Sequence, residues 1–431
     1  METTGPTLLT RAGGRTRLDL DSREICRRAT PGAGRPSPIS MLGVPFPHVT
    51  LPQAVARIGA MIASGKPHQV VTANVDFLIQ ARSDDELRRI FIDAPLVLCD
   101  GTPLVWASRL LGNPLPERVA GADLAPLLIQ AAAEQGWRLF FLGGAPDVTE
   151  AAVSLMLEKH PTLKVVGHYS PPFRPLAEMD HEEIISRVTQ AQPDILFVSF
   201  GCPKAEKWIS RHADMLGVPV MIGVGATVDF LAGRMKRAPQ WMQRAGLEWV
   251  FRLWQEPRRL AKRYAKDLWE FGTAMAGQWW ELQFGWRTSG ASSRAWLVLL
   301  ENDWQAIEMP EVLDAPTVRK NAAVWARATG RHSVVDLTGV RFIDSTGVGL
   351  LLWLRRKFSE TGRRLVLLSP SPTARRGLRQ LKVGRFFPIA ENFEEAFQLG
   401  AQPAPRAPAR SGKPEAAPRP WREFGATLVQ E

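Results

Sequence analysis

Six apolar, strand-like runs alternate with stretches of helical periodicity, and this alternation constrains the fold more than any other feature. The runs are HQVVTAN (68–74), PLVLC (95–99), WRLFFLGG (137–144), LKVVGH (163–168), PDILFVSFG (193–201) and VPVMIGVG (218–225). Helical patterns such as GADLAPLLIQAAAEQG and PDVTEAAVSLMLEKH fall between them. The alternation predicts an α/β fold, a Rossmann-like parallel sheet with helices on both faces.

The whole chain has 431 residues, and the segments on either side of this core differ from it in composition. A Ser/Gly-containing joint at 287–294 precedes further strand-like and helical patterns, which predict a second, small α/β domain. The predicted regions are a flexible basic tail (1–38), the α/β core (39–233), a basic, Trp-rich helical appendage (234–287), the second domain (294–400) and a Pro/Ala-rich flexible tail (401–431).

Neither a membrane span nor secretion is predicted. No window offers about 18 consecutive apolar residues, and the first residues lack the apolar stretch of a signal peptide. Cys26, Cys99 and Cys202 lie far apart in the sequence, which favours reduced thiols over disulfides or a zinc site. We therefore expect a cytoplasmic protein.

Most of the chain's positive charge lies in the appendage. Between Arg234 and Lys266 there are ten Lys or Arg residues and two acidic ones, and tryptophans interleave with them. Guanidinium groups bind phosphates and indoles favour the headgroup level, so the segment fits an anionic ligand at the membrane surface, with peripheral attachment. Nucleic acid is the alternative anionic partner. The helical spacing of the tryptophans argues against base stacking, and we expect no nucleic acid.

The apolar segment 267–287 leaves three interpretations open. Its tryptophan and phenylalanine side chains can lie in the membrane interface, pack against the second domain or form a contact between copies of the chain.

Polar residues and glycines follow five of the predicted strands. Because ligands of parallel sheets bind at the carboxyl ends of the strands, we expect these turns to converge on one site. A helix cap or a tight turn would explain any single one equally well. The candidate residues are Thr72, Asn74, Asp76, Asp100, Gly101, Gly143, Gly144, Lys204, Glu206, Gly225 and Asp229.

The glycine patterns favour a nucleotide without identifying it. Gly223-x-Gly225 lacks a third glycine and Gly143-Gly144 lacks the spacing of a dinucleotide-binding loop. A glycine-lined turn before a helix can still bind a diphosphate. The only Asp-x-Asp motif, Asp19-Leu-Asp21, lies in the N-terminal tail, so we predict no metal site and no cofactor. Arginines are expected to neutralise the leaving group.

Asp100 is the best candidate for a general base. It follows an apolar strand, where partial burial would raise its pKa towards the range useful for accepting a proton from an alcohol. Thr72 can orient the same hydroxyl. The alternative is that Asp100 merely caps the following helix, TPLVWASRLL.

At these residues the chain resembles the WecG/TagA/CpsF family of bacterial glycosyltransferases, over about residues 41–266. The matching segments are TANVDF, CDGTPLVWASRLLG, ERVAGADL, FFLGGAPDV, PDILFVSFGCPKAEKWI, GVGATVDFLAG, RAPQWMQRAGLEWVFRL and EPRRLAKRY. The resemblance implies inverting, metal-independent transfer from a UDP-sugar to a polyprenyl-diphosphate-linked sugar at the cytoplasmic membrane face, in surface polysaccharide synthesis.

The resemblance also implies roles for particular residues. The family's motif aspartate and threonine fall on Asp100 and Thr72, and its appendage closes the active site and touches the membrane. Where the family usually has a glutamine, this chain has Ala205, so donor or acceptor choice can differ. The family's C-terminal arginines fall on Arg237, Arg252, Arg258, Arg259 and Arg263.

The second domain resembles STAS domains of the anti-sigma-factor antagonist type, most clearly in VVDLTGVRFIDSTGVGLLLWL (334–354). The resemblance implies that a kinase phosphorylates Ser345 or Thr346. A hydroxyl at a helix start is expected to be exposed, and an added charge of about −2 can abolish a docking face. The alternative is that Ser345 simply caps the helix.

A different class of function also fits the sequence. The transferase-like domain could be degenerate and sense a nucleotide or lipid, while the STAS domain binds a partner as a signalling scaffold. Ala205 is the only residue that favours this alternative.

Overall fold

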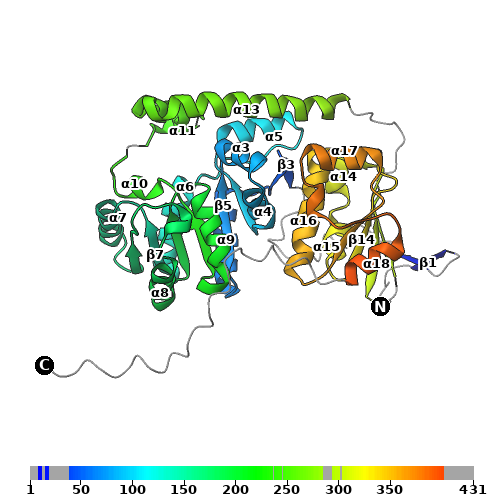
Figure 1. Ribbon diagram of the computed structural model, residues 1–431, viewed down its shortest axis with the longest axis horizontal. Helices are drawn as coiled ribbons and strands as arrows, with labels where there is room; N and C mark the ends of the chain where they lie inside the picture. The colour runs from blue at the N-terminus through cyan, green and yellow to red at the C-terminus, as the bar shows by residue number, and fades with distance from the viewer. Residues whose placement is uncertain are drawn as a thin grey trace, which may run out of the picture.

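The computed structural model describes residues 8–11, 15–18, 38–235, 237–244, 246–284, 294–300 and 303–401. Within them the chain forms a larger domain (39–284) and a smaller domain built mainly from 294–401, which lie side by side (Figure 1). Asp19, Asp21, Cys26, the joint from 287 to 293 and the C-terminal tail lie outside the described residues.

A six-stranded parallel sheet forms the centre of the larger domain, with strand order β6-β5-β10-β9-β7-β8. Its strands are nearly continuous apolar runs, as expected of a sheet covered on both faces. They are β5 (His68–Ala73), β6 (Leu96–Cys99), β7 (Arg138–Gly143), β8 (Lys164–Tyr169), β9 (Ile195–Ser199) and β10 (Val220–Gly223). The predicted parallel α/β fold is confirmed.

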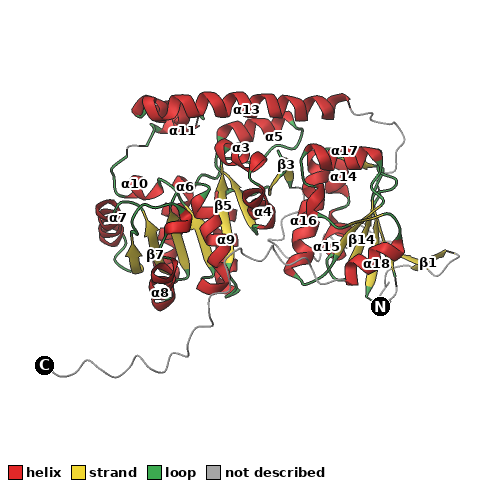
Figure 2. Cartoon of the chain, viewed as in Figure 1, coloured by secondary structure: helices red, strands yellow, loops and turns green. Residues whose placement is uncertain are grey.

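Helices cover both faces of this sheet because its side chains alternate between them (Figure 2). Phe141 and Phe197 pack on one face with α2 (Leu51–Ala63), α6 (Gly121–Gln135) and α7 (Pro146–Lys159). Phe140 and Leu196 pack on the other. The helices there are α3 (Val75–Ser83), α4 (Asp85–Asp93), α5 (Thr102–Leu110), α8 (His181–Ala191) and α9 (Lys204–Leu216).

The predicted appendage is helical. After α10 (Thr227–Leu231) come α11 (Gln240–Arg244), α12 (Glu248–Gln255) and the 28-residue α13 (Pro257–Phe284). Helix α13 runs over α3 and α5 towards the smaller domain (Figure 1), and its Phe271 and Met275 join the core beside α3. None of the helices in the described ranges has the length and hydropathy needed to cross a membrane.

The smaller domain has a seven-stranded sheet with strand order β1-β2-β11-β12-β14-β16-β17. Its remaining strands are a short pair, β13 (Val312–Leu313) and β15 (Phe342–Ile343). The sheet strands after the first two are β11 (Trp296–Leu299), β12 (Trp304–Glu308), β14 (His332–Asp336), β16 (Leu365–Leu368) and β17 (Ile389–Ala390). The helices are α14 (Ala315–Lys320), α15 (Ala322–Ala328), α16 (Ser345–Glu360), α17 (Pro372–Gln380) and α18 (Phe393–Ala401).

The prediction that residues 1–38 form only a flexible tail is wrong for two segments. Strands β1 (Leu8–Arg11) and β2 (Arg15–Leu18) form an antiparallel hairpin, and β2 pairs with β11. Strand β11 would otherwise present unpaired backbone groups at the edge of the sheet, and the hairpin satisfies them.

The two domains share a packed interface. Helix α16 packs on the hairpin β3 (Ile39–Met41) and β4 (Val44–Phe46) so closely that a Cβ on Gly349 would lie 2.4 Å from the Pro38 carbonyl oxygen. The buried Arg88 of α4 donates to the Leu381 carbonyl at 2.8 Å, and the buried Arg356 of α16 donates to the Ala94 carbonyl at 3.1 Å. These reciprocal bonds fix the smaller domain against α4.

Candidate active site

A cavity of about 990 Å³ lies at the carboxyl edge of the larger sheet, beneath α12 and α13. The turns after β5, β6, β9 and β10 line it together with α5 and α13. The prediction that strand ends converge on one site is therefore confirmed for four of the five turns. The predicted site residues that line this cavity are Thr72, Asn74, Asp76, Asp100, Gly101, Glu206, Gly225, Arg252 and Arg263.

The turn after β7 does not reach the cavity, although its two glycines were predicted to bind substrate. Gly143 and Gly144 have φ of 92° and 79°, in the left-handed region that favours glycine. A Cβ on Gly143 would lie 2.8 Å from the Phe200 ring, and one on Gly144 would lie 2.7 Å from Thr149 Oγ1. Backbone geometry and close packing therefore explain both glycines.

Other predicted ligands also lie outside the cavity lining. Lys204 donates to the Arg174 carbonyl and lies over the Phe173 and Phe200 rings. Asp229 lies in the first turn of α10. Arg237 is held in an ion-pair network beside the cavity, Arg258 is exposed on α13, and the Arg259 side chain lies outside what the structure describes.

Asp100 lies at the tip of β6 and does not cap the following helix. Gly101 occupies the cap position of α5 without a side-chain bond, whereas Asp100 Oδ2 accepts the Gly121 backbone N–H at 3.2 Å. Desolvation raises the Asp100 pKa above its ordinary value, although Arg118 and the Gly121 N–H oppose the shift. A carboxylate of raised pKa facing a cavity is suited to accept a proton.

Thr72 and Asn74 follow one another at the end of β5. The buried Thr72 hydroxyl donates to the Gly223 carbonyl at 3.3 Å. It also lies beside Gly121, whose backbone N–H donates to the Asp100 carboxylate. Asn74 accepts the Phe77 N–H at 3.2 Å as the cap of α3. The capping interpretation is therefore correct for Asn74, which also faces the cavity.

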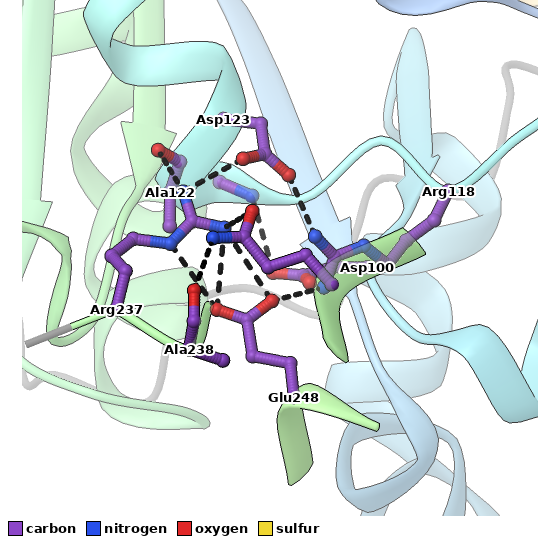
Figure 3. Close-up of polar contacts among 9 residues, drawn as sticks. Asp100, Arg118, Ala122, Asp123, Arg237, Ala238 and Glu248 are labelled. Carbon is purple, nitrogen blue, oxygen red and sulfur yellow. Dashed lines mark hydrogen bonds and ion pairs between the residues drawn. The ribbon is translucent and has the colours of Figure 1, made fainter. Parts of the chain in front are cut away.

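An ion-pair network joins the appendage to the core beside Asp100 (Figure 3). Arg118 contacts Asp123 at 2.8 Å and Glu248 at 2.6 Å. Arg237 contacts the same two carboxylates at 2.7 and 3.2 Å and donates to the Ala122 carbonyl at 3.1 Å. Each carboxylate thus bridges two guanidinium groups, and the network holds α12 against the start of α6.

Sequence reasoning did not single out Arg118 or Glu248, although both line the cavity. Arg118 lies in the segment ERVAGADL and Glu248 is one of only two acidic residues in the basic stretch. The presence of the acidic Glu248 in so basic a segment was the only sequence signal that could have pointed to this pair. The pairing itself joins residues 130 positions apart, which no local pattern reveals.

Arg252 and Arg263 supply the cavity wall with positive charge from the appendage. The Arg252 guanidinium lies over the Phe230 ring, 5.3 Å from its centroid, and Arg237 lies 5.8 Å from the same ring. Such groups can neutralise a diphosphate. In the described part of the chain, no cluster of three or more His, Cys, Asp or Glu side chains is arranged to hold a metal ion.

Two further carboxyl groups face the cavity. Glu206 is buried, Oε2 has no hydrogen-bond partner among the described residues, and burial raises its pKa to about 7. Asp267 of α13 is also buried, and burial together with the nearby Asp76 raises its pKa to about 6. Carboxyl groups held in this way are suited to bind the hydroxyl groups of a ligand.

The cavity side of α5 and of residues 268–279 of α13 is a largely apolar wall. A cavity lined by both charged groups and apolar side chains fits an amphiphilic ligand. The side chains of this wall are Trp106, Leu110, Leu268, Phe271, Met275 and Trp279.

The expected exposure of the hydroxyls at the start of α16 is wrong. Ser345 and Thr346 are 1% and 0% exposed, because this helix end docks on the larger domain. Ser345 does not cap the helix either: Asp344 does, accepting the Thr346 and Gly347 N–H groups at 2.7 and 2.9 Å. Ser345 Oγ instead accepts a hydrogen bond from Gln278, and Thr346 Oγ1 accepts one from Asn113 at 3.1 Å.

Comparison with known proteins gives a match for each domain. Residues 39–284 match the glycosyl transferase WecG/TagA/CpsF family, and residues 312–396 match the STAS domain. An N-acetylglucosaminyldiphosphoundecaprenol N-acetyl-beta-D-mannosaminyltransferase of Staphylococcus aureus strain MW2 is 29% identical over 226 residues, covering 52% of this chain and 87% of that protein. The protein of the same name from strain NCTC 8325 / PS 47 has the same identity and coverage.

Solved structures similar to the chain include two of an anti-sigma factor antagonist. SpoIIAA in its unphosphorylated form is 25% identical, with a TM-score of 0.22, and the match covers 25% of this chain and 95% of SpoIIAA. The phosphorylated form of SpoIIAA, described as a Bacillus cell fate determinant, is 26% identical with the same TM-score, covering 25% and 98%.

Proposed function

Because the chain belongs to the WecG/TagA/CpsF family of glycosyl transferases, we propose that it moves a sugar from a UDP-sugar to a polyprenyl-diphosphate-linked acceptor sugar, with inversion and without a metal ion. The observation that carries this proposal is the cavity itself. It brings together the Asp100 carboxylate, the arginines of the appendage and the apolar side chains of α5 and α13.

The proposed reaction is a direct displacement. The Asp100 carboxylate takes the proton of an acceptor hydroxyl, whose oxygen forms a bond to the anomeric carbon of the donor. The bond from that carbon to the diphosphate breaks, and UDP leaves with the electron pair. Thr72, beside the Gly121 N–H that holds Asp100, orients the attacking hydroxyl.

Arginines are proposed to stabilise the charge that develops on the departing UDP. Arg252 and Arg263 line the cavity directly, and Arg118 lies close enough to Asp100 to oppose its rise in pKa. Arg118 and Arg237 share Asp123 and Glu248 in this structure. Binding of a diphosphate would give the Arg118 guanidinium, which lines the cavity, a third anionic partner.

The acceptor's lipid is proposed to leave along the apolar wall towards a membrane surface. Trp254 and Trp269 are 78% and 74% exposed on α12 and α13, and the basic Arg258 and Lys262 are exposed on α13. Exposed indoles beside cations favour the interface of an anionic membrane. We therefore place the protein peripherally on the cytoplasmic membrane face.

The relatives suggest which substrates to test first. Their name gives N-acetylmannosamine as the transferred sugar and N-acetylglucosaminyl-diphosphoundecaprenol as the acceptor. Ala205 lines the cavity at the position where the family usually has a glutamine, so sugar choice is the property most open to difference. The STAS domain is proposed to regulate the transferase.

The test is acceptor-dependent release of UDP by the full-length protein. UDP-N-acetylmannosamine and other UDP-sugars are supplied with or without a short-chain polyprenyl-diphosphate N-acetylglucosamine, in the presence and absence of EDTA. We expect UDP release only when the lipid acceptor is present, at a rate that EDTA does not change. Arg252→Gln should release UDP more slowly than the control Arg174→Gln, because Arg252 lines the cavity and Arg174 is exposed outside it. No release with any donor would refute the proposal and favour the signalling scaffold.

A further inference from the structure

The Gln278 side chain joins the STAS domain to the helix that forms the cavity wall. Gln278 of α13 is 4% exposed, and its Nε2 donates to Ser345 Oγ of α16 and to the Ser40 carbonyl of β3, the latter at 3.0 Å. Its Oε1 accepts the Leu42 N–H at 3.2 Å. The amide thus ties together α13, the β3–β4 hairpin and the start of α16.

The part of α13 that Gln278 holds is the part that lines the cavity. Met275 and Trp279 lie within one turn of Gln278 and belong to the apolar wall. Phe271, one turn before Met275, belongs to the same wall. The outer face of this segment, with Trp269 and Trp280, is exposed. The position of the wall therefore depends on contacts made by the inner face of the helix, and Gln278 makes three hydrogen bonds there.

The STAS side of this contact is rigidly held. Arg88 and Arg356 each bind a backbone carbonyl of the opposite domain, while ion pairs join Arg355 to Asp93 and Arg385 to Asp85 at the rim. A buried cation that loses such a carbonyl partner is costly, which favours the docked arrangement. Ser345 is therefore a fixed point against which α13 is placed.

We propose that Gln278 is a positioning residue through which the docked STAS domain sets the wall of the acceptor-binding cavity. This inference rests on the proposed function, since it assigns the wall to the lipid-linked acceptor. The docked STAS domain completes the transferase, and its separation weakens acceptor binding while the UDP-sugar end, built from Asp100 and the strand tips, stays in place.

Charge at Ser345 and docking of α13 exclude each other. Ser345 is buried, its Oγ accepts a hydrogen bond from the Gln278 amide, and it follows directly after the Asp344 carboxyl group. A phosphoryl group there would add about −2 of charge to a hydroxyl that is 1% exposed and already bonded to Gln278. The modification predicted from the sequence can therefore occur only when the two domains have separated, and it would hold them apart.

The experiment compares Gln278→Ala and Ser345→Asp in the full-length protein with the wild type. Two readouts are taken: the KM values for the acceptor lipid and for the UDP-sugar, and hydrogen exchange of the amides from residue 260 to 279. We expect the acceptor KM to rise about tenfold, the UDP-sugar KM to stay within about twofold, and exchange in α13 to accelerate. Ser345→Ala, which removes only the hydroxyl, should give a smaller effect of the same kind.

Ser359→Asp is the matched control, because Ser359 is exposed at the far end of the same helix. It should leave both readouts at wild-type values. Unchanged α13 exchange in Gln278→Ala, Ser345→Asp and Ser345→Ala would overturn the inference, as would an equal rise of both KM values. Absence of transfer by the wild type would refute the proposed function instead, and the exchange data would still decide whether the STAS domain holds α13.

Discussion

Replacing Glu248 by glutamine tests whether the ion-pair network holds the appendage against the catalytic base. The Glu248 side chain is 13% exposed and bonds Arg118 at 2.6 Å and Arg237 at 3.2 Å. Hydrogen bonds to charged groups contribute about 1.5–3 kcal/mol each. Both arginines keep Asp123 and are themselves 19% and 25% exposed, so we expect a total loss of about 2 kcal/mol after discounting for solvent.

A loss of this size corresponds to a fall of about 4–8 °C in Tm for a domain the size of the transferase. Glutamine keeps the volume of the side chain, so the change reports on charge alone. Thermal unfolding followed by calorimetry measures it, with Glu183→Gln as the control. Glu183 pairs with Arg187 on the exposed surface of α8 and should leave the Tm nearly unchanged.

The same variant has a kinetic consequence with a definite sign. Desolvation is the main cause of the raised Asp100 pKa, and the negative charge of Glu248 raises it further, while Arg118 lowers it. Glu248→Gln removes the repulsion and leaves Arg118, so the rising limb of the rate against pH should move to lower pH. An unchanged Tm together with an unmoved limb, or a limb displaced to higher pH, would refute the reasoning.

Three further predictions follow from the structure. Burial raises the pKa of Glu206 and Asp344 to about 7, so the native state keeps two protons that the unfolded chain releases from about pH 4. The free energy of unfolding therefore falls as the pH rises towards about 7. The decrease in Tm between about pH 5 and 8 should be smaller in the double variant Glu206→Gln/Asp344→Asn. Gly349→Ala places a methyl group against the Pro38 carbonyl and should cost about 1–3 kcal/mol, measured by chemical unfolding, whereas Gly277→Ala in the open part of α13 should be neutral or stabilising. Trp254→Ala/Trp269→Ala should weaken co-sedimentation with anionic lipid vesicles, and Phe173→Ala, at an exposed ring outside the appendage, should not.

The parallel sheet and the position of Asp100 could be predicted because both follow from local rules. Apolar runs of strand length separated by helical periodicity specify the sheet, and the carboxyl ends of its strands must share one edge. Asp100 and Thr72 end neighbouring strands, so the topology alone brings them together. The turn after β7 lies at the same edge of the sheet, but it does not reach the cavity. Gly143 and Gly144 are glycines because their backbone has positive φ angles.

The remaining features depend on contacts between distant segments. The pairing of Arg118 with Glu248 exists only because α12 folds back over the start of α6. The burial of Ser345 depends on docking between two domains, which the composition of α16 does not reveal. Strands β1 and β2 carry too little periodicity to be predicted alone, and their pairing partner β11 lies almost 280 residues further along the chain.

The most direct test of the account is the single-turnover rate of Asp100→Asn with saturating UDP-sugar and lipid acceptor. The Asn side chain can still accept the Gly121 N–H, so the strand tip should keep its shape and the Kd for the UDP-sugar should stay within about twofold. We predict a loss of transfer of about 10²- to 10⁴-fold, while Asp214→Asn, an exposed carboxylate on α9, retains the wild-type rate. Transfer by Asp100→Asn at a rate close to that of the wild type would contradict the assignment of Asp100 as the base.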